Sequence, residues 1–417
     1  MKQDTKCGKR IVVKYGGSSL ANHQLVSKAA QAVAEVVTKG VQTAVVVSAI
    51  GKTTNMLLKT ARNSSNGHIG RKELDDILAM GERTAIRIFA AALNGNGATS
   101  HYFDPLEAQW PIVTDDAFSN ANPLLDECRK RIKEHVLPLM EHNIIPVIAG
   151  FVGKTLDGKI TTLGRGGSDT TALILADALD ADEAVLVTNA KGIMSADPDI
   201  VSTPKTLPQI DVDTLTGIAD SGAKFIHRKA LRYKNPAIDV KVVSNNHDLT
   251  SPGTLLTGAL STYLDVTLAH PSPTMSITVV GRGISKEPDI VLELARTVKS
   301  RAPLLGLSLN YDSIILYVSQ DEPGTRRLLE EIHQIVLKHE ATIAMSVHQH
   351  LAFLKVKGVG LEETPGVIGK ITETLRQNDL NIFGILTITS SILLFVDWAT
   401  KDTTQELVRT ALRGKTA

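Results

Sequence analysis

Three glycines, an arginine, a serine and an aspartate stand together in residues 161–172, which read Thr-Thr-Leu-Gly-Arg-Gly-Gly-Ser-Asp-Thr-Thr-Ala. Glycines let a ligand approach the main chain closely, and free N–H groups at the start of a helix expected over 170–179 favour an anion. Arg165 offers a planar fork that suits a carboxylate or a phosphate. Taken alone, the stretch is more often a plain turn with Asp169 as a helix cap, so other residues must decide.

A second glycine turn lies near the N-terminus. Lys14 shortly precedes Gly16 and Gly17, whose N–H groups can line a nest for phosphate. A cation there would offset the charge of a phosphoryl group during its transfer. The spacing is neither a P-loop nor a dinucleotide fingerprint, and a solvated lysine beside a turn is the alternative. Lys224 is a candidate second cation, with a surface lysine as its alternative, and Asp169 would hold both ammonium groups in place.

Phosphoryl transfer depends mainly on positioning and charge stabilisation. For a small acidic acceptor, Arg165 would clamp one carboxylate and Glu82 would bind an ammonium group. Glu82 by itself is more often a solvated helix charge. The neutral hydrogen-bond donors would be three hydroxyl side chains, Ser48, Thr54 and Ser168.

The segments around these residues alternate as in an open α/β sheet. Strand candidates and helical patterns follow one another, the strands at 11–13, 41–49, 101–103, 144–151 and 184–188 and the long helices at 22–39 and 73–93. This alternation predicts a mostly parallel sheet covered by helices on both faces. Four loops each follow a strand candidate and are expected to converge at one edge, where such sheets bind ligands: 14–19, 48–55, 164–169 and 188–197.

After about residue 257 the pattern becomes β-α-β-β-α-β and then β-α-β-β-α. Two ferredoxin-like units with a repeat of roughly 75 residues are the plain interpretation. Separate strands are expected at 342–347, closing the first unit, and at 351–359, opening the second. The second unit lacks its last strand, and a bare sheet edge is a liability, so the segment 263–268 is predicted to fill it.

The bulk composition excludes several classes of protein. A length of 417 residues indicates two or three domains, and a formal net charge of +1 without a basic block gives nucleic acid or membrane surfaces no electrostatic support. The two cysteines, Cys7 and Cys128, exclude a disulfide framework and a Cys/His zinc cluster. Without a membrane-spanning apolar run or a signal peptide, a cytoplasmic protein is expected.

Five blocks match, in order, the signature blocks of the aspartate kinases, a branch of the amino-acid kinase superfamily: 14–19, 48–55, 81–82, 161–172 and 222–227. The blocks Gly-Arg-Gly-Gly-Ser-Asp-Thr-Thr-Ala and Ser-Ala-Ile-Gly-Lys-Thr-Thr-Asn are highly specific. The C-terminal units resemble ACT regulatory domains, so the resemblance covers nearly the whole chain. It implies an amino-acid kinase domain over 1–257 and two ACT-like domains over 258–348 and 349–417, with 262–270 pairing with the second.

The resemblance also implies an activity: ATP-dependent phosphorylation of the side-chain carboxylate of L-aspartate to 4-phospho-L-aspartate, with Mg²⁺, the first step towards lysine, threonine and methionine. The matching catalytic residues are Lys14, Asp169 and Lys224, and the matching substrate residues are Ser48, Thr54, Glu82, Arg165 and Ser168. The matching ATP-binding residues are Lys14, Gly16, Gly17, Ser18, Thr188, Asn189, Met194, Asp197 and Lys224. No protein side chain is predicted to bind the metal.

In this family, feedback inhibitors such as lysine or threonine usually bind at interfaces between ACT domains, which implies a homo-oligomer. The candidate effector residues lie in two loops of the second ACT-like unit and are Thr364, Pro365, Gly366, Val367, Asn381 and Ile382. An ordinary helix start with proline in its first turn is the alternative explanation for the first loop.

The chain departs from the family pattern in its nucleotide loop, at Asn189, Lys191, Met194 and Asp199, and His227-Arg228 replaces a His-Pro pair. Asp199 stands where the family usually has an arginine, and the loss of this cation near the phosphates is expected to weaken ATP binding by about 1–3 kcal/mol. Two alternatives to an aspartate kinase remain. One is another enzyme of the superfamily, acting on glutamate, acetylglutamate or a nucleotide, and the other is a non-catalytic regulatory subunit that binds amino acids.

Overall fold

The computed structural model describes residues 8–197, 200–219, 226–245, 248–260, 264–320, 322–358, 361, 365–388 and 391–413. The chain divides into two units, Met1–Leu260 and Ser261–Ala417. No helix within these described stretches combines the length and the apolar character that a bilayer crossing requires.

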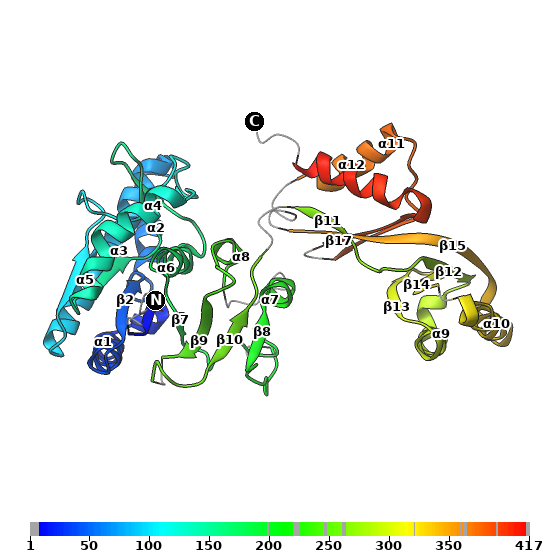
Figure 1. The fold of residues 1–417 in the computed structure, drawn as a ribbon, viewed down its shortest axis with the longest axis horizontal. Helices are drawn as coiled ribbons and strands as arrows, with labels where there is room; N and C mark the ends of the chain where they lie inside the picture. Colours follow the sequence, from blue (N-terminus) through cyan, green and yellow to red (C-terminus); the bar gives the residue numbers. More distant parts are fainter. Residues whose placement is uncertain are drawn as a thin grey trace, which may run out of the picture. The chain divides into compact units, whose positions relative to one another are not determined.

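The first unit is built on an eight-stranded sheet in the order β3-β4-β2-β1-β7-β9-β10-β8 (Figure 1). In this order, each strand from β3 through β4, β2, β1 and β7 to β9 runs parallel to its neighbour, and β10 runs antiparallel to β9. The mostly parallel sheet expected from the sequence is therefore confirmed. In sheet order the strands are Ser100–Phe103, Ile145–Ala149, Gln42–Val47, Arg10–Tyr15, Glu183–Thr188, Asp239–Ser244, Thr254–Thr257 and Gln209–Asp211.

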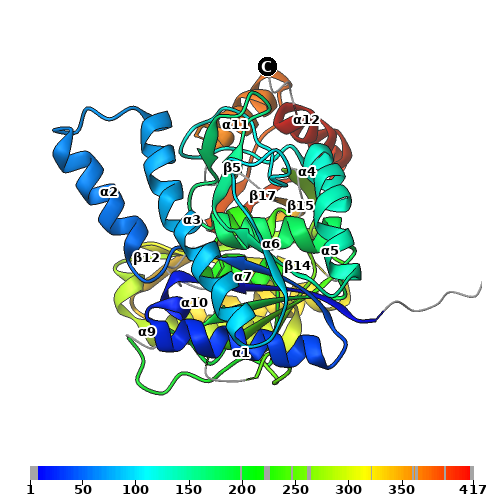
Figure 2. The ribbon, with the colours of Figure 1, turned by 90° about the vertical axis from the view of Figure 1, so that its left-hand side faces the viewer.

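Helices cover both faces of this sheet (Figures 1 and 2). Helices α1 and α3 pack together, and α6 packs on β1, β2 and β7 with α4 and α8 beside it. The central strands β2 and β4 are buried almost throughout, which explains their uniformly apolar sequences. The helices are α1 His23–Thr38, α2 Thr53–Ser64, α3 Arg71–Gly95, α4 Leu125–Arg131, α5 Leu137–Glu141, α6 Gly167–Ala178, α7 Val212–Ala219 and α8 Arg228–Leu231.

A short hairpin, β5 Val152–Lys154 and β6 Ile160–Thr162, lies between β4 and the glycine turn at 164–167. The sequence analysis expected that turn to follow the strand at 144–151 and did not anticipate the hairpin between them. It arises because the chain must return before α6 can begin beside the end of β4. The return is tight: a Cβ atom on Gly150 would lie 2.6 Å from the Cβ atom of Ser168.

The second unit contains two ferredoxin-like halves. The first comprises β12 Thr274–Gly281, α9 Pro288–Arg301, β13 Leu304–Leu309, β14 Ser313–Ser319, α10 Glu322–Lys338 and the start of β15 Thr342–Lys357. The second comprises the rest of β15, α11 Val367–Gln377, β16 Gly384–Ile388, β17 Ser391–Asp397 and α12 Lys401–Arg413. Strand β11, Asp265–Leu268, pairs with the end of β15 and takes the fourth place in the second half.

Strand β15 joins the two halves without a break, whereas two separate strands were expected. Its first part pairs with β12 and its last part with β17. The polar run between the apolar segments resembles a loop in sequence. In the structure it stays extended as far as His350, whose φ of 57° marks a local irregularity where the partner strand changes.

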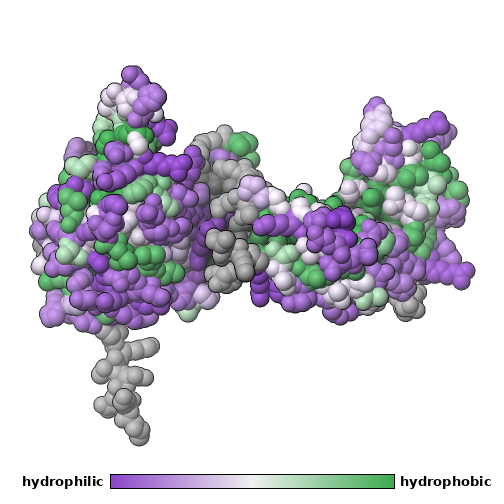
Figure 3. All heavy atoms as spheres, turned by 90° about the horizontal axis from the view of Figure 1, so that it is seen from above, coloured by the Kyte–Doolittle hydropathy of each residue, from purple (hydrophilic) through white to green (hydrophobic). Residues whose placement is uncertain are grey.

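The two halves share an aromatic core. Tyr317 of β14 stacks on Phe395 of β17 with ring centroids 3.7 Å apart. Phe353 of β15 also stacks on Phe395. Apolar side chains also lie on the surface of the second unit (Figure 3). They include Leu309 on β13 and Ile388 on β16, two strands that have a hydrogen-bonded neighbour on one side only.

Candidate active site

Two of the three residues singled out for phosphoryl transfer, Lys14 and Asp169, meet at the carboxyl end of β1, and the third, Lys224, lies outside the described residues. Lys14 is the penultimate residue of that strand, and Asp169 lies in the first turn of α6. The Nζ atom of Lys14 is 2.6 Å from Oδ1 of Asp169, and the side chains are only 15% and 12% exposed. Residues 155 positions apart thus form a sheltered ion pair, in which the carboxylate holds the ammonium group at the strand end.

The backbone around this ion pair depends on glycine. A Cβ atom on Gly17 would lie 2.7 Å from the carbonyl oxygen of Ala49, so the loops after β1 and β2 touch. A hydrogen bond from the Gly51 N–H to the Gly17 oxygen, 2.9 Å, joins the same loops. Gly166 precedes α6 with a φ of 72°, and a Cβ atom there would lie 2.3 Å from that of His227. These close approaches bring the loops after β1 and β2 together and place the start of α6 against the residue before α8.

Hydroxyl groups from β2 and α6 meet beside the ion pair. Ser48 follows β2 and donates a hydrogen bond of 2.8 Å from its Oγ to the Oγ of Ser168, the residue before Asp169. Thr54, in the first turn of α2, lies with its Oγ1 3.4 Å from Oε1 of Glu82. Two of the candidate hydroxyl groups, those of Ser48 and Ser168, are thus hydrogen-bonded to each other, and the third, that of Thr54, lies beside the carboxylate of Glu82.

Glu82 is a buried carboxylate on α3, with 2% of the residue exposed. Its Oε1 receives only two long contacts of 3.4 Å, from the Ala49 N–H and from Thr54. Its Oε2 is buried and has no hydrogen-bond partner among the described residues. Burial raises the pKa of Glu82 to about 7. A carboxylate so poorly satisfied by the protein is suited to receive a cationic group from a ligand.

The raised pKa of Glu82 gives a testable pH dependence. If Glu82 binds a substrate ammonium group, only its ionised form serves, so kcat/KM for that substrate should fall about tenfold per pH unit below about 7. The pH profile of kcat/KM for ATP should not show this acidic limb, the fall in kcat/KM below about pH 7. In Glu82→Gln the limb should vanish and the activity at pH 8 should drop. A wild-type profile that is flat from pH 5.5 to 8 would remove Glu82 from substrate binding.

Arg165 lies in the glycine turn three residues after β6 and is exposed. No ion pair joins it to any residue in the described part of the chain. Its guanidinium fork is thus available to a ligand at the mouth of the site, next to Ser168 and Asp169 in sequence.

The described residues matched to ATP binding lie in or after β1 and β7, which are neighbouring parallel strands. Ser18 is exposed, and its neighbour Ser19 donates to the Val187 oxygen at 3.2 Å, which links the two loops. Asn189 accepts a hydrogen bond of 2.9 Å from the Nδ2 of Asn245. Thr188, Met194 and Asp197 are partly exposed along the same loop. Lys224 and Asp199 lie outside the described residues, so the second cation stays a prediction.

Two buried residues that the sequence interpretation missed hold the segment directly before the glycine turn at 164–167. Asp75 on α3 accepts hydrogen bonds from Ser119 and Thr162, and Lys229 on α8 donates to main-chain oxygens that include that of Leu163. Nothing in the local sequence distinguishes Asp75 from its exposed neighbour Asp76, because the donors are distant along the chain. The helical period of α3 places Leu74, Leu78 and Glu82 on the buried side. This period was the one available sequence signal for the burial of Asp75, but it does not indicate its hydrogen-bond partners.

The candidate effector residues lie at the two ends of α11 and beyond it. Thr364 is outside the described residues, Pro365 and Gly366 are exposed, and Val367 is buried in the core of the second half. Asn381 is exposed, and its Oδ1 accepts a hydrogen bond of 3.0 Å from the N–H of Ile382. This local hydrogen bond explains Asn381 as a turn residue. Its role towards an effector stays a prediction.

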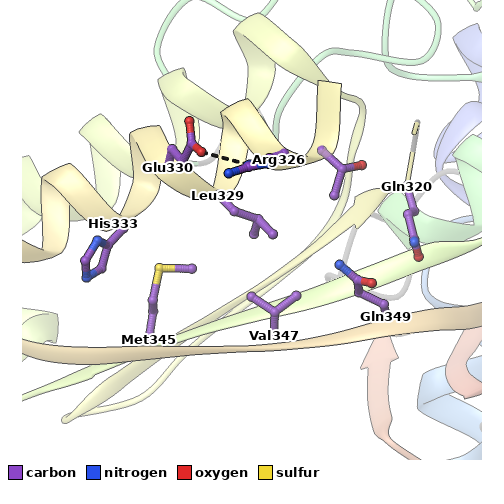
Figure 4. Close-up of a pocket in the computed structure, with 9 residues that line it drawn as sticks. Gln320, Arg326, Leu329, Glu330, His333, Met345, Val347 and Gln349 are labelled. Atoms are coloured by element: carbon purple, nitrogen blue, oxygen red, sulfur yellow. Dashed lines mark hydrogen bonds and ion pairs between the residues drawn. The ribbon is translucent and has the colours of Figure 1, made fainter. Parts of the chain in front are cut away.

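A pocket of about 550 Å³ lies elsewhere in the second unit, between α10 and β15. Leu329, Met345 and Val347 point toward one another across it (Figure 4). Arg326 and Glu330 form an exposed ion pair of 3.1 Å at its rim. None of the five candidate effector residues that the structure describes lines this pocket.

Comparison with known proteins agrees with this geometry. The family model described as "Amino acid kinase family" matches residues 9–244. An aspartokinase of Geobacillus stearothermophilus is 31% identical over 381 residues, 89% of each chain, and one of Bacillus sp. (strain MGA3) is 31% identical over 390 residues, also 89% of each chain.

Two solved structures have a similar fold. An aspartate kinase from Synechocystis superimposes with a TM-score of 0.73 at 23% identity, covering 98% of this chain and 70% of that one. E. coli aspartokinase III in complex with aspartate and ADP gives a TM-score of 0.54 at 22% identity, covering 97% of this chain and 100% of that one.

Proposed function

The chain belongs to the aspartokinases of the amino acid kinase family, and from that premise we propose that it transfers the γ-phosphoryl group of ATP to the side-chain carboxylate of L-aspartate. The observation that carries this proposal is the 2.6 Å ion pair between Lys14 and Asp169 at the carboxyl end of β1. An ammonium group fixed there, between the loops of β1, β2 and β7, is suited to charge developing on a phosphoryl group in transfer.

In the proposed reaction, a side-chain carboxylate oxygen of aspartate attacks the γ-phosphorus of ATP. A new P–O bond forms while the bond from the γ-phosphorus to the bridging oxygen breaks, and ADP leaves with the electron pair. The acceptor carboxylate is already ionised at neutral pH, so no base is required. The protein contributes alignment and charge stabilisation, with Lys14 facing the transferred group and Asp169 holding Lys14 in place.

The acceptor side of the site fits an amino acid with a second carboxylate. Glu82 would pair with the α-ammonium group, since its Oε2 is buried without a hydrogen-bond partner in the described part of the chain. Arg165 would bind one carboxylate through its fork, and Ser48, Thr54 and Ser168 would donate hydrogen bonds around it. The product is 4-phospho-L-aspartate.

ATP and Mg²⁺ are the proposed phosphoryl donor and metal. The nest at Gly16 and Gly17 and the loop after β7 are suited to phosphates and to a nucleotide. Among the described residues, no three His, Cys, Asp or Glu side chains cluster as metal ligands. We propose that Mg²⁺ is carried mainly by the nucleotide phosphates. Bound in that way, Mg²⁺ would supply further neutralisation of phosphate charge.

One assay tests the proposal and separates it from its rivals. The purified protein is incubated with ATP, Mg²⁺ and one acceptor, L-aspartate, L-glutamate or acetylglutamate, and the acyl phosphate is trapped as a hydroxamate. We expect turnover on aspartate alone. Turnover on another acceptor would assign the chain to a different activity of the family, and no turnover on any acceptor would favour a regulatory protein.

Regulation and assembly form the remaining part of the proposal. The ACT-like halves are proposed to bind an amino-acid effector such as lysine or threonine through the loops around α11, and E. coli aspartokinase III has been solved with lysine and aspartate. Exposed apolar residues on the edge strands β13 and β16 support assembly of a homo-oligomer through this unit. A cytoplasmic location, in keeping with only two cysteines in 417 residues, completes the proposal.

A further inference from the structure

Asp75 is a fully buried carboxylate that joins helix α3 to two segments far along the chain. Its Oδ2 accepts from the N–H of Ser119 at 2.7 Å and of Thr162 at 2.9 Å, and its Oδ1 accepts from the hydroxyl groups of the same two residues at 3.2 and 2.8 Å. No cation pairs with it among the described residues. A buried charge held only by neutral donors needs all of them, so its removal should loosen both segments.

Lys229 holds the same two segments from the opposite chemical side. It is 6% exposed, and its Nζ donates to the Leu163 oxygen at 2.6 Å, to the Asn120 Oδ1 at 2.7 Å and to the Ala121 oxygen at 3.2 Å. The two segments also bond to each other, through the Ala121 N–H and the Thr162 oxygen at 2.9 Å. Asp75 therefore binds their N–H groups and Lys229 their carbonyl oxygens. We call these two residues and the segments 119–121 and 162–163 the brace.

The brace is connected to the two charged groups of the proposed aspartate site, to Glu82 through α3 and to Arg165 through the glycine turn. Glu82 follows Asp75 by seven residues on α3, which places both on one face of the helix, two turns apart. Arg165 follows Thr162 by three residues, in the glycine turn that begins directly after Leu163. A Cβ atom on Gly164 would lie 2.8 Å from Oδ1 of Asn120, so the turn also rests against the brace. The separation of Glu82 and Arg165 is thus fixed through Asp75.

We propose that Asp75 and Lys229 are positioning residues that set the spacing between Glu82 and Arg165, and thereby make the site select aspartate over the longer glutamate. This inference rests on the proposed function, in which Glu82 takes the ammonium group and Arg165 a carboxylate. Neither Asp75 nor Lys229 touches the substrate. A looser brace lets the two charged groups move apart, which weakens aspartate binding and reduces the discrimination against an acceptor with one more methylene group.

Asp75→Asn tests the inference because it keeps the shape but removes the negative charge and one acceptor oxygen: the amide oxygen can still accept from the two N–H groups, while the amide nitrogen faces the hydroxyl groups of Ser119 and Thr162, which can then no longer donate to it. We expect KM for aspartate to rise at least tenfold, kcat and KM for ATP to stay within threefold, and the kcat/KM ratio of aspartate to glutamate to fall at least fivefold. Asp76→Asn, on the exposed side of the same helix, is the matched control and should behave as wild type. Lys229→Met should reproduce the Asp75→Asn pattern, and Lys229→Arg should restore part of the aspartate KM.

If Asp75→Asn does not fold, Thr162→Val removes one of the four donors and should show the same pattern more weakly. Amide hydrogen exchange over 163–167 is the second readout and should quicken in Asp75→Asn but not in Asp76→Asn. An unchanged aspartate KM with unchanged exchange, or equal losses in kcat and in both KM values, would overturn the inference. If wild type ignores aspartate, the proposed function fails instead, and exchange alone decides whether the brace exists.

Discussion

Replacing Lys14 by alanine should lower kcat by about three orders of magnitude while leaving the fold intact. An ammonium group aimed at developing charge in a sheltered site contributes far more to the transition state than to the bound substrates. Lys14 is 15% exposed and 2.6 Å from Asp169, so solvent does not replace it readily. Initial rates with saturating ATP and aspartate, combined with a thermal unfolding curve for each protein, measure the effect.

Lys28→Ala is the matched control for this experiment, because Lys28 is an exposed lysine on α1, outside the site. Its kcat should equal that of wild type. A Lys14→Ala protein with near-normal kcat and a normal unfolding curve would remove Lys14 from the mechanism. A loss confined to KM for ATP would reduce its role to nucleotide binding.

Replacing Arg165 by alanine should raise KM for aspartate by about 10–100-fold and leave KM for ATP within about twofold. The range follows from the loss of a charged hydrogen bond of about 1.5–3 kcal/mol, at about 1.4 kcal/mol per tenfold change. Because Arg165 is exposed and has no ion pair with the described residues, its loss should not disturb the fold. Steady-state kinetics with each substrate varied in turn provide the measurement.

Arg165→Lys distinguishes charge from geometry at the same position. Lysine keeps the positive charge but lacks the planar fork, so it should recover only part of the aspartate affinity. Full recovery would show that charge alone is needed. Equal increases of both KM values in Arg165→Ala would contradict its assignment to the aspartate carboxylate.

Much of the fold could be predicted because its determinants are local. Asn22 caps α1 through a 2.9 Å hydrogen bond from the Leu25 N–H, at the residue where the helix was expected to begin. Helix α9 spans Pro288–Arg301, and proline in its first turn marks its start. Apolar runs likewise located β1, β2, β3, β4 and β7 of the first sheet, whereas β8, β9 and β10 were not anticipated. Local periodicity and caps are read directly from neighbouring residues.

The features that were missed depend on distant partners. The continuity of β15 could not be recognised, because its polar middle stays extended only through pairing with β12. The role of Asp75 was invisible, because its donors lie 44 and 87 positions away. The proximity of Lys14 and Asp169 was anticipated through the convergence of loops at strand ends. The hairpin that leads the chain back to α6 was not anticipated.

The central claim is that Lys14 and Asp169 act as one unit on the transferred phosphoryl group. A double-mutant cycle on the single-turnover rate with ATP and aspartate, using Lys14→Ala, Asp169→Ala and the double variant, tests it most directly. The double variant should be about as slow as the slower single variant, since either change already dismantles the pair. Rate losses that simply multiply would mean that the two residues act separately, and that the site described here is not where the phosphoryl group moves.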